Sequence, residues 1–88
     1  MDFEEQVADS AGVASRLVEL AISLAGQNRW DEGAELLTRA AAHVPSLAGS
    51  ERKDAMNALR GYAAQARKQG DSETAERFTS LALELATE

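Results

Sequence analysis

An internal repeat constrains the fold of this chain more than any other feature of its sequence. Residues 26–45 read GQNRWDEGAELLTRAAAHVP, and residues 68–87 read KQGDSETAERFTSLALELAT. At an offset of 42 positions the two segments align Gln27 with Gln69, Gly33 with Ala75, Glu35 with Arg77 and Ala40 with Ala82. Self-similarity at a fixed period indicates that one supersecondary unit is built twice and that each copy buries an apolar face against the other.

The composition indicates that the repeated unit is helical. Alanine is abundant, Pro45 is the single proline, and Val, Ile and Thr are scarce. Ala, Leu, Glu and Arg lose little side-chain freedom in a helix. We therefore predict an all-α fold of four helices in two antiparallel helical hairpins, because helices joined by short turns pack as antiparallel neighbours. The single domain spans residues 1–88, with hairpin 1 at about 2–44, a link at 45–49 and hairpin 2 at about 50–87.

The first helix is predicted to run from Asp2 or Phe3 to about Gly26. Asp2 and Glu5 have the spacing of a capping box, which places the helix start there. Apolar residues then recur at alternating spacings of four and three, in two rows about 110° apart. The first row is mostly small and the second is large: Val7, Ala11, Ala14, Val18, Ala21 and Ala25 form one, and Val13, Leu17, Leu20 and Leu24 form the other. We expect both flanks of this helix to be buried.

Residues 27–29 form a predicted tight turn in which Asn28 takes the left-handed conformation. Asp31 is the predicted cap of a second helix that reaches about Val44, where Pro45 ends it. The positions expected to face inward are Gly33, Leu36, Leu37, Ala40, Ala41 and Val44.

The second hairpin repeats this pattern with clearer end signals. A third helix is capped by Ser50 or nearby and runs to Gln69, and Gly70 closes it in the left-handed conformation. Asp71 caps the fourth helix. The positions expected to face inward are Ala55, Met56, Leu59, Tyr62, Ala63 and Ala66 in the third helix, and Ala75, Phe78, Leu81, Ala82 and Leu85 in the fourth.

Both copies resemble the tetratricopeptide repeat (TPR), and the resemblance spans nearly the whole chain. In the first copy Trp30 stands on the aromatic turn position, Gly33 and Ala40 on the two small positions, and Pro45 on the closing proline. Further matches are Leu17, Leu20, Ala21 and Leu24 in the first copy, and Leu59, Tyr62, Ala63, Lys68-Gln69-Gly70-Asp71, Ala75 and Ala82 in the second. The second copy departs from the pattern at Ala66, Ser72 and Thr87. The period of 42 also exceeds the family's common 34, which implies longer helices and a longer link.

The small residues at these positions have a physical reason. We expect Gly33 to meet Ala21 across the first hairpin and Ala75 to meet Ala63 across the second, so that the backbones approach closely. A leucine at any of these positions would overpack the crossing and cost about 1–3 kcal/mol.

The resemblance implies a TPR-like right-handed array whose first helices line a concave groove that holds a peptide or a helix of a partner. Carried over by position, the candidate groove residues are Ser15, Val18, Ile22 and Ala25 from the first repeat, and Asn57, Arg60, Ala64, Arg67 and Lys68 from the second. The cations among them share one helical face, so the implied ligand is a short acidic and hydrophobic segment. In the plainer alternative, these cations pair with acidic residues of neighbouring helices and contribute little. Trp30 is expected to pack the hairpin turn rather than to anchor a partner.

The side chains needed for catalysis are scarce. The chain has no cysteine and a single histidine, His43, which is expected at the surface near a helix end without a second ligand for a metal. The serines include no nucleophile elbow, and the glycines form no phosphate-binding loop. We therefore expect neither enzymatic activity nor a metal or other cofactor.

The net charge of −6 argues against nucleic acid as a partner, because phosphate contacts need clustered cations. Residues 49–70 are basic between acidic flanks, so the alternative is weak contact of the third helix with phosphate. The N-terminus lacks the basic region and apolar run of a secretory signal, and no stretch reaches the ~20 apolar residues that cross a bilayer. A cytoplasmic protein without membrane contact is expected.

The role that these observations favour is a protein-interaction module: an adaptor, a chaperone or an assembly subunit. Two repeats are fewer than a stacked array usually needs, and Leu83 and Ala86 lie off the inward stripe of the last helix. We therefore expect a homo-oligomer or a chain docked on a larger partner. The alternatives are a structural oligomer that needs no external ligand and a regulatory fragment of a larger helical array.

Overall fold

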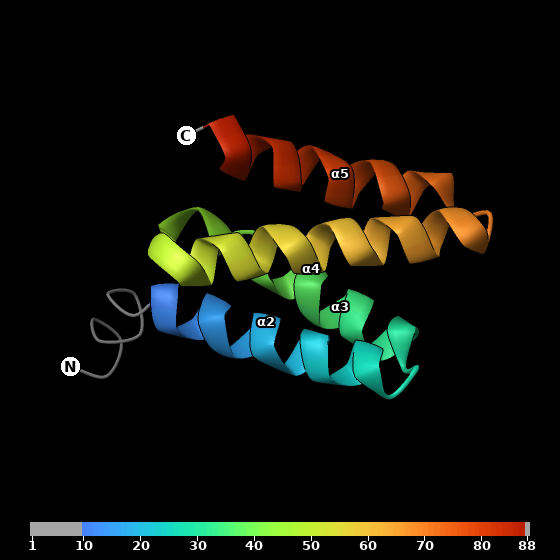
Figure 1. The fold of residues 1–88 in the computed structure, drawn as a ribbon, viewed down its shortest axis with the longest axis horizontal. Coiled ribbons are helices and arrows are strands. Elements are labelled where there is room, and N and C mark those ends of the chain that lie inside the picture. Colours follow the sequence, from blue (N-terminus) through green and yellow to red (C-terminus); the bar gives the residue numbers. More distant parts are fainter. Residues whose placement is uncertain (1–9, 88) are drawn as a thin grey trace.

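The computed structural model of the chain describes residues 10–87, and all secondary structure within that range is helical. Four α-helices follow one another, with a single turn of 3₁₀-helix between the second and the third (Figure 1). Their bounds are α2 (Ser10–Gly26), α3 (Trp30–Ala40), η1 (Val44–Ser46), α4 (Gly49–Lys68) and α5 (Ser72–Thr87). The predicted all-α fold with four helices is confirmed. The predicted helix start at Asp2 or Phe3, its capping box and Val7 lie outside the described residues.

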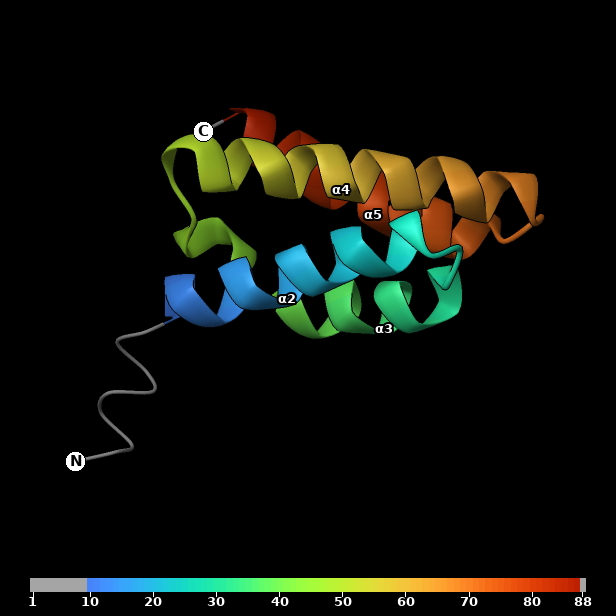
Figure 2. The ribbon, with the colours of Figure 1, turned by 60° about the horizontal axis from the view of Figure 1, so that its bottom comes forward.

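The helices pack as two antiparallel hairpins. α2 lies against α3 and α4 lies against α5, and these two pairs make the most extensive packing in the molecule. α4 sits between α5 and the first hairpin, and α2 and α4 run in the same direction (Figures 1 and 2). The α2–α4 contact is therefore the main seam between the two hairpins.

The turns of the two hairpins are the same structure, built 42 residues apart. Asn28 has φ 65° and Gly70 has φ 81°, so both occupy the left-handed region as predicted. The closing hydrogen bonds are equivalent in the two copies: Arg29 N to Leu24 O at 2.8 Å, and Asp71 N to Ala66 O at 2.9 Å. The sequence repeat is thus a repeat of backbone geometry.

The two turns differ in their side chains. The Asp71 carboxylate accepts hydrogen bonds from the Thr74 amide at 3.2 Å and the Thr74 hydroxyl at 2.8 Å, which confirms the predicted cap of α5. In the first hairpin the prediction was wrong, because α3 begins at Trp30 with Arg29 as its cap residue. Asp31 lies inside the first helical turn, where a carboxylate still interacts favourably with the helix dipole.

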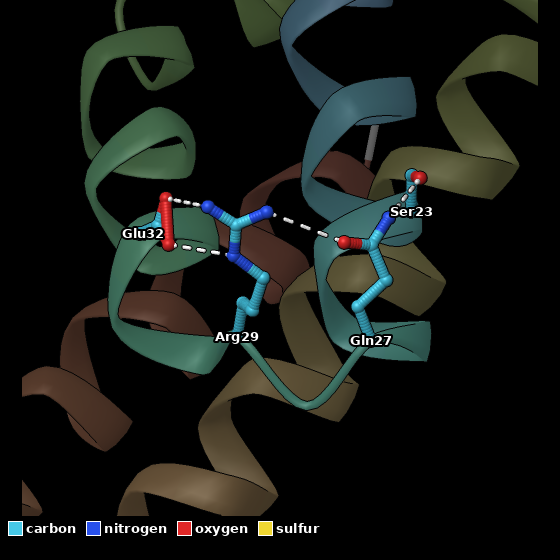
Figure 3. Close-up of polar contacts among 4 residues, drawn as sticks. All are labelled: Ser23, Gln27, Arg29 and Glu32. Atoms are coloured by element: carbon cyan, nitrogen blue, oxygen red, sulfur yellow. Dashed lines mark hydrogen bonds and ion pairs between the residues drawn. The ribbon is translucent and has the colours of Figure 1, made fainter.

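Arg29 ties this first turn together with its side chain (Figure 3). Its guanidinium group donates to both carboxylate oxygens of Glu32 at 2.7 Å and to the Gln27 side-chain oxygen at 3.3 Å. Gln27 in turn donates to the Ser23 hydroxyl at 3.4 Å. The chain of contacts runs from the last turn of α2 to the first turn of α3, although an exposed bidentate pair of this kind stabilises by only about 1 kcal/mol.

α3 ends at Ala40, earlier than the predicted Val44. Pro45 has no N–H to donate to the carbonyl of Ala41, and its ring disfavours the α conformation in the residue before it, so α-helix is unfavourable in the turn that precedes it. The backbone tightens instead, with hydrogen bonds from His43 N to Ala40 O at 2.8 Å and from Leu47 N to Val44 O at 3.0 Å. α4 starts at Gly49 after an extended Ala48, so the predicted cap residue Ser50 lies inside the first helical turn and no side chain caps the helix.

The core combines a few large side chains with many alanines. The largest fully buried side chains are Phe78, Leu37, Leu47, Leu59 and Val44. The buried alanines that bring the helices close together are Ala14, Ala21, Ala40, Ala55, Ala58, Ala63, Ala66, Ala75 and Ala82. The predicted inward stripes of the last three helices are confirmed, with Leu36, Ala41, Met56 and Leu81 half-buried rather than buried.

Gly33 lies against a side chain of the second hairpin. A Cβ atom at Gly33 would lie 1.6 Å from the Tyr62 hydroxyl oxygen, and the nearest atoms around it all belong to the Tyr62 ring. The Tyr62 hydroxyl donates to the Ala21 carbonyl oxygen. Gly33 therefore makes room for a ring from the second hairpin that lies between α2 and α3, and the contact of Gly33 with Ala21 stays a prediction.

The second apolar row of α2 is less buried than predicted. Ala14, Val18 and Ala21 of the first row are buried, but Val13 is 37% exposed and Leu20 is 48% exposed. Leu17 and Leu24 of the second row are half-buried. α3 and α4 cover the first row of α2. No other helix of the described part of the chain covers Val13 and Leu20 of the second row, so these two side chains are exposed to solvent.

Candidate protein-interaction groove

A pocket of about 270 Å³ opens on the seam between α2 and α4. We call it the α2–α4 pocket. The pocket is lined by Ile22 and Ala25 from α2, by Asp54, Asn57, Ala58 and Gly61 from α4, and by the rings of Trp30 and Tyr62. The lining is mostly apolar, so the hollow suits an apolar group.

Small residues on α4 create this hollow. Ala58 and Gly61 lie three positions apart on one face of the helix, and a Cβ atom at Gly61 would meet nothing within 4 Å. Ile22 stands opposite them and remains 46% exposed, although it is a large apolar residue. An exposed isoleucine beside an apolar hollow is the kind of feature that a partner covers.

Aromatic side chains form the floor of the pocket and hold it rigid. Trp30 and Tyr62 meet edge to face, with ring centroids 4.9 Å apart and an interplanar angle of 72°. Tyr62 also meets Phe78 edge to face at 6.4 Å. Trp30 donates its indole N–H to the Asn28 side-chain oxygen at 3.1 Å. These contacts confirm that Trp30 packs the hairpin turn, and they hold together two of the side chains that line the pocket.

Burial raises the pKa of the Tyr62 hydroxyl above its ordinary value of 10.0. The neutral hydroxyl is the form that donates to the Ala21 carbonyl, so the floor is uncharged over the physiological pH range.

The seam continues toward the N-terminal ends of both helices as a smaller pocket of about 30 Å³. Its lining residues are Ser15, Val18, Glu19, Ile22, Glu51 and Asp54. Ser15 donates its hydroxyl to the Glu51 carboxylate at 3.1 Å and so links α2 to α4. The two pockets share Ile22 and Asp54 and together form one groove along the seam.

The structure brings together five of the nine predicted groove residues. Ile22, Ala25 and Asn57 line the α2–α4 pocket, and Ser15 and Val18 join Ile22 in the smaller pocket, where Val18 is buried. The other predicted residues, Arg60, Ala64, Arg67 and Lys68, are exposed and line neither pocket. Arg67 donates to the Thr79 hydroxyl of α5 at 3.3 Å.

Position along and around α4 explains this division. The α4 residues that reach the pocket are Asp54, Asn57, Ala58 and Gly61. Arg60 lies about 60° further around the helix axis than Asn57, and Ala64, Arg67 and Lys68 lie beyond Gly61 along the axis.

Asp54, Ala58 and Gly61 are groove residues that the sequence analysis missed, and their shared face could have revealed them. Trp30 and Tyr62 were predicted as core residues, and they serve both as core and as the pocket floor.

A third hollow of about 120 Å³ lies on the other side of the Trp30–Tyr62 pair, near the α4–α5 turn. Its lining is more polar and includes Asp31, Gln65, Gln69 and Asp71. Among residues 10–87 no group of three or more histidine or acidic side chains could hold a metal ion. The helices in that part of the chain are also too short or too polar to span a bilayer.

Comparison of the chain with protein-family models, curated proteins and solved structures found no match.

Proposed function

We propose that this chain is a protein-interaction module that binds a segment of a partner protein along the α2–α4 groove. The observation that carries this proposal is the α2–α4 pocket, an apolar hollow that leaves Ile22 46% exposed at its edge. Its volume of about 270 Å³ falls below the roughly 300–1,000 Å³ of pockets that enclose drug-sized ligands. It suits one or two inserted side chains better than a small-molecule substrate.

The resemblance to the tetratricopeptide repeat supports the same role. In that family the first helices of successive hairpins line the ligand groove, and here α2 and α4 are the first helices of the two hairpins. We accordingly propose a TPR-like stack without enzymatic activity. An adaptor, a chaperone or an assembly subunit would all use such a groove.

The experiment that tests this function places one change inside the groove and another outside it. Ile22→Gln removes the apolar edge of the pocket. The double change Arg60→Glu with Arg67→Glu alters the exposed side of α4 that carries these two arginines, which we call the outer face of α4. If the groove binds the partner, Ile22→Gln weakens binding of partners recovered with the wild-type chain by roughly tenfold or more, as expected for a central apolar contact. Loss of binding in the double variant alone would place the site on the outer face of α4 instead.

A second candidate role is a homo-oligomer that covers exposed helix flanks. Val13 and Leu20 on α2 and Leu83 on α5 are large apolar residues, and Leu83 is 58% exposed. Molecular mass measured by light scattering across a dilution series separates the two roles. A stable dimer that is dissociated by Leu20→Gln or Leu83→Gln, and that leaves no site for a second protein, would favour the oligomer.

A further inference from the structure

The charge at the edge of the α2–α4 pocket is negative. Among its described lining residues Asp54 alone carries a charge. The adjoining smaller pocket shares Asp54 and adds Glu19 and Glu51. Carboxylates from both helices thus stand next to the exposed Ile22, at the end of the groove where α2 and α4 begin.

Within residues 10–87 no ion pair joins a lysine or arginine to these carboxylates. The ion pair found there joins Arg29 to Glu32 in the first turn, away from the groove. Glu51 accepts a hydrogen bond from the Ser15 hydroxyl, which is neutral. Glu19, Glu51 and Asp54 are all exposed, so their charges are available to a ligand.

The cations of α4 do not offset this charge at the pocket. Arg60 and Arg67 lie off the groove, and Arg67 reaches toward Thr79 on α5. A partner that placed a carboxylate beside its apolar anchor would bring it against Asp54, and like charges at an interface are repulsive. The acidic ligand expected from the sequence fits the outer face of α4 rather than the pocket.

From this geometry we infer that the partner segment is both apolar and basic. It inserts one large apolar side chain between Ile22 and the Trp30–Tyr62 floor, and it places a lysine or arginine beside Asp54 and Glu51. Because Ile22 and Asp54 border both pockets, the two ligand groups are neighbours, as at positions three or four apart on a helix. The inference rests on the proposed function and specifies the chemistry of its ligand.

The test is a selection of binders from a phage-displayed library of random dodecapeptides against the full 88-residue chain. The expected peptides carry a large apolar residue with a lysine or arginine within four positions. Their affinities are then measured for the wild type and for Asp54→Lys. Because an exposed charge pair contributes modestly, the reversal is expected to weaken binding by about five- to tenfold at low salt. The loss shrinks as added salt screens the charges.

Glu76→Lys is the matched control, since it makes the same change in net charge on an exposed residue of α5 that lines none of these pockets. It is expected to change the affinity by less than about twofold, as distant exposed charges are screened. Helical circular dichroism of each variant checks that it is folded.

The outcomes separate this inference from the function on which it rests. Selected peptides that need Ile22 but carry acidic residues, or that show no preference of charge, would overturn the basic-ligand inference and leave the groove as the site. If the library yields no binders, or if their affinity is unchanged by Ile22→Gln, both the inference and the proposed function are wrong.

Discussion

Gly33 and Tyr62 fit together because Gly33 has no side chain. A Cβ atom at Gly33 would lie 1.6 Å from the Tyr62 hydroxyl oxygen. Gly33 belongs to α3 and Tyr62 to α4, and the same hydroxyl donates to the Ala21 carbonyl on α2. One tyrosine therefore locks the second hairpin into the first. The same side chain lines the α2–α4 pocket, so the core contact and the candidate site depend on one ring.

Gly33→Ala is expected to destabilise the chain by about 1–3 kcal/mol, the usual cost of overpacking a core. The Tyr62 ring cannot swing aside cheaply, because it is held between Trp30 and Phe78. Urea unfolding followed by circular dichroism measures the change. Gly61→Ala is the matched control, since its methyl group meets open space within a helix and is expected to stabilise the chain by up to about 1 kcal/mol. Equal effects of the two substitutions would contradict the predicted clash.

Tyr62→Phe is expected to cost about 0.5–1.5 kcal/mol, because it removes the hydrogen bond to Ala21 and keeps the ring. The variant should also respond differently to alkali. The folded pKa of Tyr62 is raised, so its contribution to stability is present below pH 10.0 and is lost as the pH rises through the folded value. Unfolding free energies from pH 9 upward should therefore fall more steeply for the wild type than for Tyr62→Phe. Parallel curves would refute this role of the hydroxyl.

Asp71 is expected to make the stability of the chain sensitive to acid rather than to alkali. The hydrogen bond from the Thr74 hydroxyl, helped by the bond from the Thr74 amide and by the charge of Arg77, lowers the pKa of Asp71 below its ordinary 3.8. Its contribution to stability is therefore present above pH 3.8 and is lost as the pH falls through the lowered value. Asp71→Asn keeps a capping group without a charge, so its stability should depend less on pH between 5 and 2.5. An NMR titration that gives the Asp71 carboxyl an ordinary pKa would count against this prediction.

Arg52 joins the link between the hairpins to the end of α5. Its guanidinium group donates to the backbone oxygens of Leu85 at 3.1 Å and of Leu47 at 3.1 Å. Hydrogen bonds from a charged donor are stronger than neutral ones, so Arg52→Ala is expected to cost about 1.5–3 kcal/mol. Amide hydrogen exchange should accelerate in the last turn of α5 and around η1, and much less elsewhere. Lys53→Ala, at the exposed neighbouring position, should leave these exchange rates unchanged.

The parts of this fold that could be predicted from the sequence are those fixed by local chemistry. The left-handed turns at Asn28 and Gly70 and the cap at Asp71 depend on residues a few positions apart, and all three are confirmed. The inward stripes of α4 and α5 follow from helical periodicity in the same way.

The errors arose where distant residues decide the outcome. The exposure of Leu20 depends on which helices pack beside α2, and the periodicity of one helix cannot show that its second apolar row lacks a neighbour in the described fold. The size of Gly33 is set by Tyr62, which lies 29 positions further along the chain. The early end of α3 is an exception, because it lies in the turn just before Pro45 and is a local effect.

Only some of the residues that line the candidate groove were named from the sequence. Ile22, Ala25 and Asn57, three of the candidate groove residues, line the α2–α4 pocket. The cations Arg60 and Arg67 do not reach the pocket, since Arg60 lies further around the α4 axis than Asn57 and Arg67 lies beyond Gly61 along it. Asp54 and its neighbouring acids were missed, and with them the sign of the charge at the pocket.

Chemical-shift mapping tests the central claim, that the α2–α4 groove is the binding surface, most directly. A ¹⁵N-labelled chain is titrated with the highest-affinity peptide from the selection, and the amide shifts of residues 10–87 are followed. The predicted result is a contiguous set of changes at Ile22, Asp54, Asn57 and Gly61, with little change at Leu83 on the outer face of α5. Changes centred on Leu83, or on Arg60 and Arg67 with Ile22 and Gly61 unmoved, would contradict the account.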